Sequence, residues 1–202
     1  MIMPDNAPSE DAPPTLVVGL GNPLLGDDGV GWRVAEEVQR ALQGSERPVE
    51  VDCLSVGGLG LMERMAGHDR VILIDAMAGG SRPPGTLYRL LLEDLPDPGA
   101  GHLASAHDTT LQTAMQVGRV LEVPLPREVW VVGVEAHVTY EFAEGLSPSV
   151  SEAVGPAARL VLELLDRDCH GIPKQFTQGG LPWFHPNCCG ATRFSPTWTT
   201  PR

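Results

Sequence analysis

The chain has 202 residues, of which 42% are hydrophobic, so it can bury the core of one domain and is not disordered throughout. Its 26 acidic residues outweigh 14 basic ones and give a formal net charge of -12. Such a surface repels phosphate backbones and anionic lipid, so we expect neither a nucleic acid nor a membrane as a partner. No apolar run reaches the roughly 18 residues needed to span a bilayer.

The start of the chain and its cysteines indicate the compartment. Residues 1–14 contain neither a basic region nor a hydrophobic region of the kind found in secretory signals, and we expect a short disordered lead-in. The four cysteines, Cys53, Cys169, Cys188 and Cys189, lack the spacing of a disulfide framework. Reduced thiols in a cytoplasmic protein are the simplest interpretation.

The first elements are a strand, a turn and a helix. Apolar β-branched residues predict a strand over Thr15–Leu20, and glycines, Asn-Pro and two aspartates predict a turn over Gly21–Asp28. A helix is predicted from Gly29, where apolar residues recur at helical spacing. Asp27 and Asp28 come just before it, where carboxylates can cap free N–H groups.

The rest of the chain continues the alternation of strands and helices. Strands are predicted over Val49–Leu54, Arg70–Ile74, Gly85–Leu92 and Glu128–Val134, and helices over Leu59–Met65, Thr109–Leu121 and Ser149–Leu165. The strand at Gly85–Leu92 has no helix before it, so we expect an antiparallel strand at the sheet edge. This pattern predicts an α/β domain over 15–167 with a mostly parallel sheet covered on both faces. Residues 168–202 lack periodicity and are predicted to be an irregular C-terminal extension.

Three polar loops follow strands of the predicted sheet. They carry Asp27 with Asp28, Asp75, and Ser105 with His107. Ligands of open α/β sheets gather beyond the carboxyl ends of the strands, where these loops should meet. Two carboxylates and one imidazole are suitable ligands for nickel, zinc or iron. The same carboxylates could instead orient a hydrolytic water as general base, and the residues leave both roles open.

Each of these residues also has an ordinary structural explanation. An aspartate before a helix, such as Asp27, is usually an N-cap. Asp75 at the end of a strand can cap or turn the chain. A single loop histidine such as His107 is weak evidence by itself. The convergence of the three loops therefore carries the prediction.

Other motifs are weaker. Gly19, Gly21 and Gly26 are similar to a dinucleotide fingerprint, with Asp52 near the position of a ribose-binding acid, but the third glycine is displaced. A zinc site in the tail lacks paired cysteine spacing. Its candidate ligands are Cys169, His170, His185, Cys188 and Cys189. No nucleophile elbow, P-loop or zincin motif is present.

Three segments together resemble the hydrogenase maturation proteases: GLGNPLLGDDGVGWRVAEEV after the first strand, RVILIDA, and SAH in the third loop. The match runs from about Leu16 to Leu165. The resemblance implies a three-layer α/β/α sandwich with a twisted, mostly parallel sheet. It also implies an aspartic-type endopeptidase that removes the C-terminal extension of a [NiFe]-hydrogenase large-subunit precursor after nickel insertion.

The resemblance also assigns residues. Nickel held by the precursor is the recognition mark, and Asp28, Asp75 and His107 stand where the family contacts it. Asp28 and Asp75 are then also the catalytic candidates, and some relatives carry Glu at the position of Asp28. We expect a monomer without a permanently bound metal. The turn over residues 55–58, SVGG, departs from the family pattern, so no substrate contact is assigned there.

Three alternatives remain. A peptidyl-tRNA hydrolase has a similar GLGNP start, but the T-R-H-N stretch expected after it is missing and the charge of -12 is wrong for tRNA. A non-catalytic nickel-sensing module could dock on the hydrogenase precursor. A nicotinamide oxidoreductase would bind its dinucleotide at the glycine-rich turn.

Overall fold

The computed structural model describes residues 14–79, 82–95, 110–137, 142–143 and 145–166. The chain divides into two units, residues 1–170 and 171–202, and the second lies wholly outside the described residues. The predicted lead-in and C-terminal extension therefore stay predictions. Within the described ranges, no helix has the length and apolar content that a membrane span needs.

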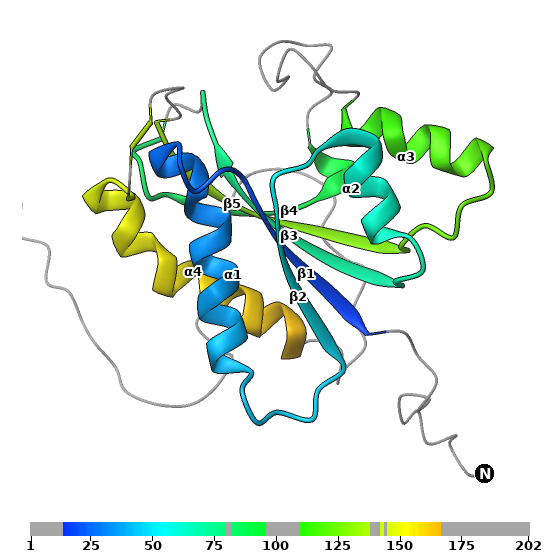
Figure 1. Ribbon diagram of the computed structural model, residues 1–202, viewed down its shortest axis with the longest axis horizontal. Coiled ribbons are helices and arrows are strands. Elements are labelled where there is room, and N and C mark those ends of the chain that lie inside the picture. Colours follow the sequence, from blue (N-terminus) through cyan, green and yellow to red (C-terminus); the bar gives the residue numbers. More distant parts are fainter. Residues whose placement is uncertain (1–13, 80–81, 96–109, 138–141, 144, 167–202) are drawn as a thin grey trace, which may run out of the picture. The chain divides into compact units, whose positions relative to one another are not determined.

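Strands and helices alternate along the first unit, as predicted (Figure 1). The elements are β1 (Thr15–Leu20), the 3-10 helix η1 (Gly26–Gly29), α1 (Val30–Ala41), β2 (Val49–Leu54), α2 (Gly58–Met65), β3 (Arg70–Met77), β4 (Leu87–Leu91), the 3-10 helix η2 (Leu92–Asp94), α3 (Leu111–Val120), β5 (Glu128–Glu135) and α4 (Pro148–Asp166). The bounds of β1 and β2 are those predicted, and the other predicted elements are all present with shifted ends.

The five strands form one sheet in the order β2-β1-β3-β5-β4. The pairs β1/β2, β1/β3 and β3/β5 are parallel, whereas β4 is antiparallel to β5 and lies at the edge. Parallel neighbours need a crossover connection, which the helices between the strands provide. The predicted mostly parallel α/β sheet with an antiparallel edge strand is confirmed.

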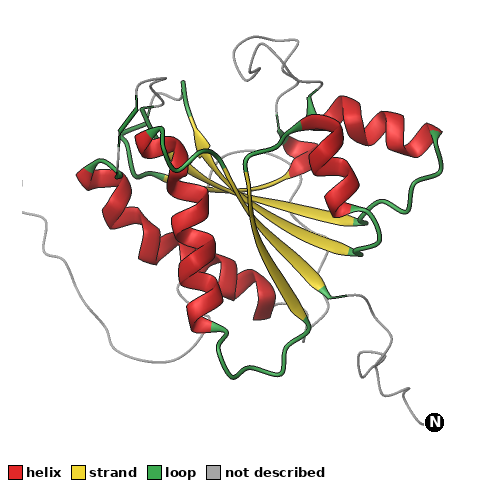
Figure 2. Ribbon diagram, viewed as in Figure 1, coloured by secondary structure: helices red, strands yellow, loops and turns green. Residues whose placement is uncertain are grey.

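Helices cover both faces of this sheet. Figure 2 shows α1 and α4 on one side and α2 and α3 on the other. Successive residues of a strand point to opposite faces, and β3 follows this rule: Ile72 and Ile74 pack with α1 and α4, whereas Val71 and Leu73 pack with α2 and α3. Because both faces are covered, β3 is apolar at nearly every position.

Two glycines bring α1 unusually close to the sheet. A Cβ on Gly31 would lie 2.2 Å from the carbonyl oxygen of Leu20 and 2.5 Å from that of Ile74. A Cβ on Gly19 would lie 2.3 Å from the carbonyl oxygen of Gly31. The first turn of α1 is therefore held against the carboxyl ends of β1 and β3, where the predicted site residues lie.

Two details near these strand ends differ from the prediction. β3 does not end before Asp75 but continues to Met77, because residues 75–77 pair with β5. A 3-10 helix precedes α1, and neither helix start has a side-chain cap, so Asp27 and Asp28 do not cap it. Both carboxylates bond elsewhere.

Candidate functional site

Asp28 is held by the segment over residues 21–29, which we call loop 1. Gly21 has φ 117°, and a Cβ there would lie 1.8 Å from the carbonyl oxygen of Asp28, so only glycine lets the loop fold back this tightly. The backbone N–H of Asn22 donates to Asp28 Oδ2 at 2.6 Å. Loop 1 thus fixes one carboxylate just beyond the end of β1.

Asp75 lies in β3, between β1 and β5 in the sheet. The pKa of the Asp75 carboxyl is raised from its ordinary 3.8 to about 7. Burial is the larger cause and the negative charge of Asp28 the smaller, while a hydrogen bond from the backbone of Ala76 opposes the change. Asp28 and Asp75 are therefore near enough to interact electrostatically. The structure brings together the two carboxylates that the sequence predicted to converge.

Two carboxylates that repel one another favour a proton or a cation between them. With a pKa near 7, Asp75 can exchange its proton at neutral pH, which suits a general base. An approaching cation would instead favour the ionised form of both acids. Strongly perturbed carboxyls of this kind are typical of functional sites, because acid and base catalysis needs groups with a pKa matched to the task.

Asp27 has a different environment from its neighbour. It is buried, with 8% of its surface exposed. Its Oδ1 accepts from the backbone N–H of Ser147 at 2.6 Å, and its Oδ2 accepts from the Ser147 hydroxyl at 2.9 Å. Ser147 directly precedes α4, so Asp27 joins loop 1 to the start of a helix 120 residues away in sequence. It does not face Asp75 as a member of the carboxylate pair.

The third predicted ligand, His107, and its neighbour Ser105 lie outside the described residues. The tail cysteines and histidines considered for zinc lie outside them as well. Within the described ranges, no three side chains of His, Cys, Asp or Glu come together as a metal site. The ligand set of Asp28, Asp75 and His107 therefore stays a prediction.

Asp52 has a structural explanation. Its Oδ2 lies 2.5 Å from Arg64 Nε, and the same guanidinium lies 2.8 Å from Glu50 Oε2. These ion pairs join β2 to α2 on the surface. Gly19 and Gly21, the first two glycines of the dinucleotide pattern, serve the close packing of loop 1 and α1. The nicotinamide alternative thus has no support from the residues that suggested it.

Sequence reasoning missed a buried acid at the end of β5. Glu135 is only 4% exposed, and the hydroxyl of Tyr88 in β4 donates to its Oε2 at 2.5 Å. Asp75 pairs with Gly133 and Met77 with Glu135, so Glu135 lies on the same sheet face as Asp75. Burial and the bond to Glu135 raise the pKa of Tyr88. The feature of the sequence that could have indicated this acid is the glutamate that ends the apolar run EVWVVGVE.

Exposed apolar side chains surround loop 1. Phe142 is 86% exposed and Leu24 is 55% exposed, and they lie close together because the N–H of Ala143 donates to the carbonyl of Leu24 at 3.1 Å. Val56 and Leu59, also exposed, follow β2, whose end is tied to loop 1 through Ser55 Oγ and the carbonyl of Gly21 at 2.7 Å. Apolar residues gathered beside a polar site are typical of surfaces that bind another protein.

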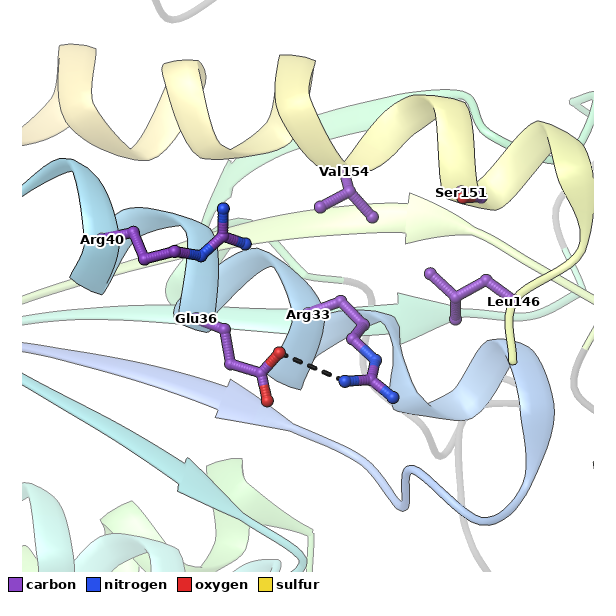
Figure 3. Close-up of a pocket in the computed structure, with 6 residues that line it drawn as sticks. All are labelled: Arg33, Glu36, Arg40, Leu146, Ser151 and Val154. Carbon is purple, nitrogen blue, oxygen red and sulfur yellow. Dashed lines mark hydrogen bonds and ion pairs between the residues drawn. The ribbon is translucent and has the colours of Figure 1, made fainter. Parts of the chain in front are cut away.

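A shallow hollow lies elsewhere, between α1 and α4 (Figure 3). Its volume is about 300 Å³, and its lining includes Arg33 and Glu36, which form an ion pair at 3.2 Å. Both side chains of the pair are about half exposed, so it is a solvated surface contact. Asp28 and Asp75 do not line this hollow. The two carboxylates lie near the carboxyl ends of the neighbouring strands β1 and β3.

Known proteins match this chain over the same region. Residues 13–164 match the hydrogenase maturation protease family. The hydrogenase expression/formation protein HupD of Thiocapsa roseopersicina is 31% identical over 155 residues, which cover 76% of this chain and 68% of the relative. The hydrogenase 2 maturation protease of Escherichia coli (strain K12) is 30% identical over 168 residues, which cover 79% of this chain and 96% of the relative.

Comparison with solved structures also finds a hydrogenase maturation endopeptidase. The hydrogenase maturating endopeptidase HybD from E. coli shares 28% identity and superimposes with a TM-score of 0.62. The superposition covers 77% of this chain and 93% of HybD. The matched region contains β1, loop 1 and β3, which carry Asp28 and Asp75. The chain therefore belongs to the hydrogenase maturation protease family and is an endopeptidase of hydrogenase maturation.

Proposed function

We propose that this protein removes the C-terminal extension of a [NiFe]-hydrogenase large-subunit precursor after nickel insertion, and that it recognises the nickel already bound to the precursor. The observation that carries the proposal is the Asp28–Asp75 pair near the carboxyl ends of β1 and β3, in which one carboxyl has a pKa of about 7. Similarity to a protein named hydrogenase 2 maturation protease supports the choice of substrate.

Asp28 and Asp75 contact the nickel of the precursor in this proposal, and His107 supplies the third contact. Carboxylate oxygen and imidazole nitrogen suit nickel. The two acids repel one another in the free protein, so a dication between them relieves that repulsion and favours their ionised forms. The free protein keeps no metal of its own, because two carboxylates and one histidine from separate loops bind weakly without the ligands that the precursor adds.

Docking through the nickel holds the scissile peptide bond beside the same carboxylates. Positioning of this kind lowers the entropic cost of hydrolysis. One of the two carboxylates, which the dication keeps ionised, then removes a proton from the attacking water, and we assign this step to Asp75. The mechanism is in this sense of the aspartic type.

The precursor also contacts the apolar side chains around loop 1, Leu24 and Phe142 in particular. These residues bind the polypeptide on either side of the scissile bond. Neither a nucleic acid nor a membrane takes part, in keeping with the net charge of -12. We propose that the protein acts as a monomer in the cytoplasm.

The test incubates the purified protein with a nickel-loaded large-subunit precursor and measures the precursor by intact mass spectrometry. A nickel-free sample of the same precursor is the matched control. Loss of one discrete C-terminal peptide from the loaded form alone is expected. Asp28→Asn and His107→Ala should both abolish this loss, because each removes one nickel contact.

Two results would contradict the proposal. Equal cleavage of the loaded and nickel-free precursors would exclude nickel as the recognition mark. Binding of the loaded precursor without any cleavage would favour the non-catalytic docking module. In that case the Asp75→Asn variant would restore precursor processing in a strain that lacks this protein. If the protein is instead an endopeptidase that uses Asp75, the variant would not restore processing.

A further inference from the structure

Asp27 is the neighbour of a proposed nickel contact, yet its carboxylate is occupied by Ser147. We propose that Asp27 is a positioning residue: by joining loop 1 to the segment before α4, it fixes Asp28 opposite Asp75. This inference rests on the proposed function, because it assigns Asp27 a role through Asp28. It also gives Asp27 a role that the sequence did not assign to it.

The join between loop 1 and the chain before α4 has several parts, which involve Ala143 and Ser147. Leu25 and Ala143 form a parallel bridge. The N–H of Gly26 donates to the carbonyl of Ala143 at 3.0 Å, and the N–H of Ala143 donates to the carbonyl of Leu24 at 3.1 Å. Asp27 adds two bonds to Ser147 and is the side chain that completes this contact. Figure 1 shows η1 beside the segment that leads into α4.

Loop 1 is tight enough to transmit this constraint to the next residue. Asp27 and Asp28 lie in the same 3-10 turn, Gly26–Gly29. A Cβ on Gly29 would lie 2.7 Å from Cα of Pro23, so the last residue of this turn packs closely against an earlier part of loop 1. A shift of Asp27 away from Ser147 must therefore move Asp28 as well. The bond from the N–H of Asn22 to Asp28 Oδ2 reports such a movement.

Two substitutions of Asp27 distinguish positioning from chemistry. Asn keeps an oxygen for the N–H of Ser147, and the Ser147 hydroxyl can turn to accept from the new amide. Ala removes both bonds. A positioning residue therefore tolerates Asn and not Ala, whereas a general base or metal ligand loses as much with Asn as with Ala.

The experiment measures kcat and KM for cleavage of the nickel-loaded precursor. Asp27→Ala should lower kcat/KM by about 10- to 100-fold, because a misplacement of Asp28 by about 1 Å can cost that much. Asp27→Asn should recover most of the loss, and Ser147→Ala should lie between them. Asp69→Asn, an exposed acid just before β3, should match the wild type.

A second measurement needs neither precursor nor nickel. Hydrogen exchange of the Asn22 amide reports whether Asp28 stays in place. Asp27→Ala should speed this exchange by about tenfold or more, whereas Asp27→Asn should leave it unchanged. If Asp27→Ala does not fold, Ser147→Ala replaces it, because this variant also removes a bond between Asp27 and Ser147. The positioning role would be overturned by unchanged exchange in both Asp27→Ala and Ser147→Ala. An equal loss of kcat/KM in Asp27→Asn and Asp27→Ala would overturn it as well. If the wild type cleaves no precursor, the proposed function fails, and the exchange result still decides the role of Asp27.

Discussion

Two regions of the molecule gather charged side chains, and they differ in how the charges are balanced. Between β2 and α2, Glu50 and Asp52 bond to Arg64, and this contact lowers the pKa of Glu50. Near the carboxyl ends of β1 and β3, Asp28 and Asp75 are two like charges, and the pKa of Asp75 is raised to about 7 by burial and by the charge of Asp28. Opposite charges stabilise the first region modestly. Like charges in the second lower stability and provide a place for a cation or a proton.

The largest difference between the regions should be in activity. Asp75→Asn should reduce precursor cleavage by about 1000-fold or more, the upper part of the range for loss of a general base, because it also removes a nickel contact. Asp52→Asn, the same change in the balanced region, should leave cleavage nearly unchanged. Initial rates from intact mass spectrometry would test this, and a comparable loss in both variants would contradict the distinction.

Replacing a helix glycine with alanine should change the unfolding free energy differently in the two regions, in α1 beside Asp28 and in α2 beside Arg64. A Cβ on Gly31 of α1 would lie 2.2 Å from a backbone oxygen, so Gly31→Ala should cost about 1–3 kcal/mol of unfolding free energy or more. A Cβ on Gly60 of α2 meets only Val56 Cβ at 3.8 Å, so Gly60→Ala should stabilise by about 0.5–1 kcal/mol. Urea unfolding of both variants would measure these effects, and equal effects would show that α1 is not held by its glycine.

Stability should depend on pH with opposite signs in the two regions. The folded protein binds a proton at Asp75 more tightly than the unfolded chain does, so this contribution to stability falls as pH rises from about 4 to about 7. Asp75→Asn should remove that fall, worth about 1.4 kcal/mol for each unit of pKa change. The lowered pKa of Glu50 acts in reverse, since its contribution is lost as pH falls below 4.5. Unfolding curves at several pH values would separate the two.

The smallest effect should come from the balanced region itself. Arg64→Met keeps much of the apolar length of the side chain and removes the ion pairs to Glu50 and Asp52. Because these charges are partly exposed, the loss of stability should be less than about 1 kcal/mol and should shrink further in high salt. Cleavage should not change. A loss of several kcal/mol in thermal unfolding would mean that the network supports the fold.

Local sequence patterns predicted the bounds of an element correctly where those bounds depend only on the residues of the element and its flanking turns. β1 and β2 have the predicted bounds because a short apolar run between turns needs no information from other segments. β3 was predicted too short, because its last residues are held by pairing with β5, more than 50 residues later. Glu135 was missed for the same reason, since its partner Tyr88 comes from another strand.

The sequence by itself determined the class of fold, the family and the two candidate acids Asp28 and Asp75. It could do so because hydrophobic periodicity and the glycine-rich motif are local features of the chain. Only the tertiary structure decided what Asp27, the neighbour of Asp28, bonds to. Its partner is Ser147, which lies 120 residues from Asp27 in the sequence. The pKa of Asp75 was also decided there, because burial and a neighbouring charge exist only once the chain has folded.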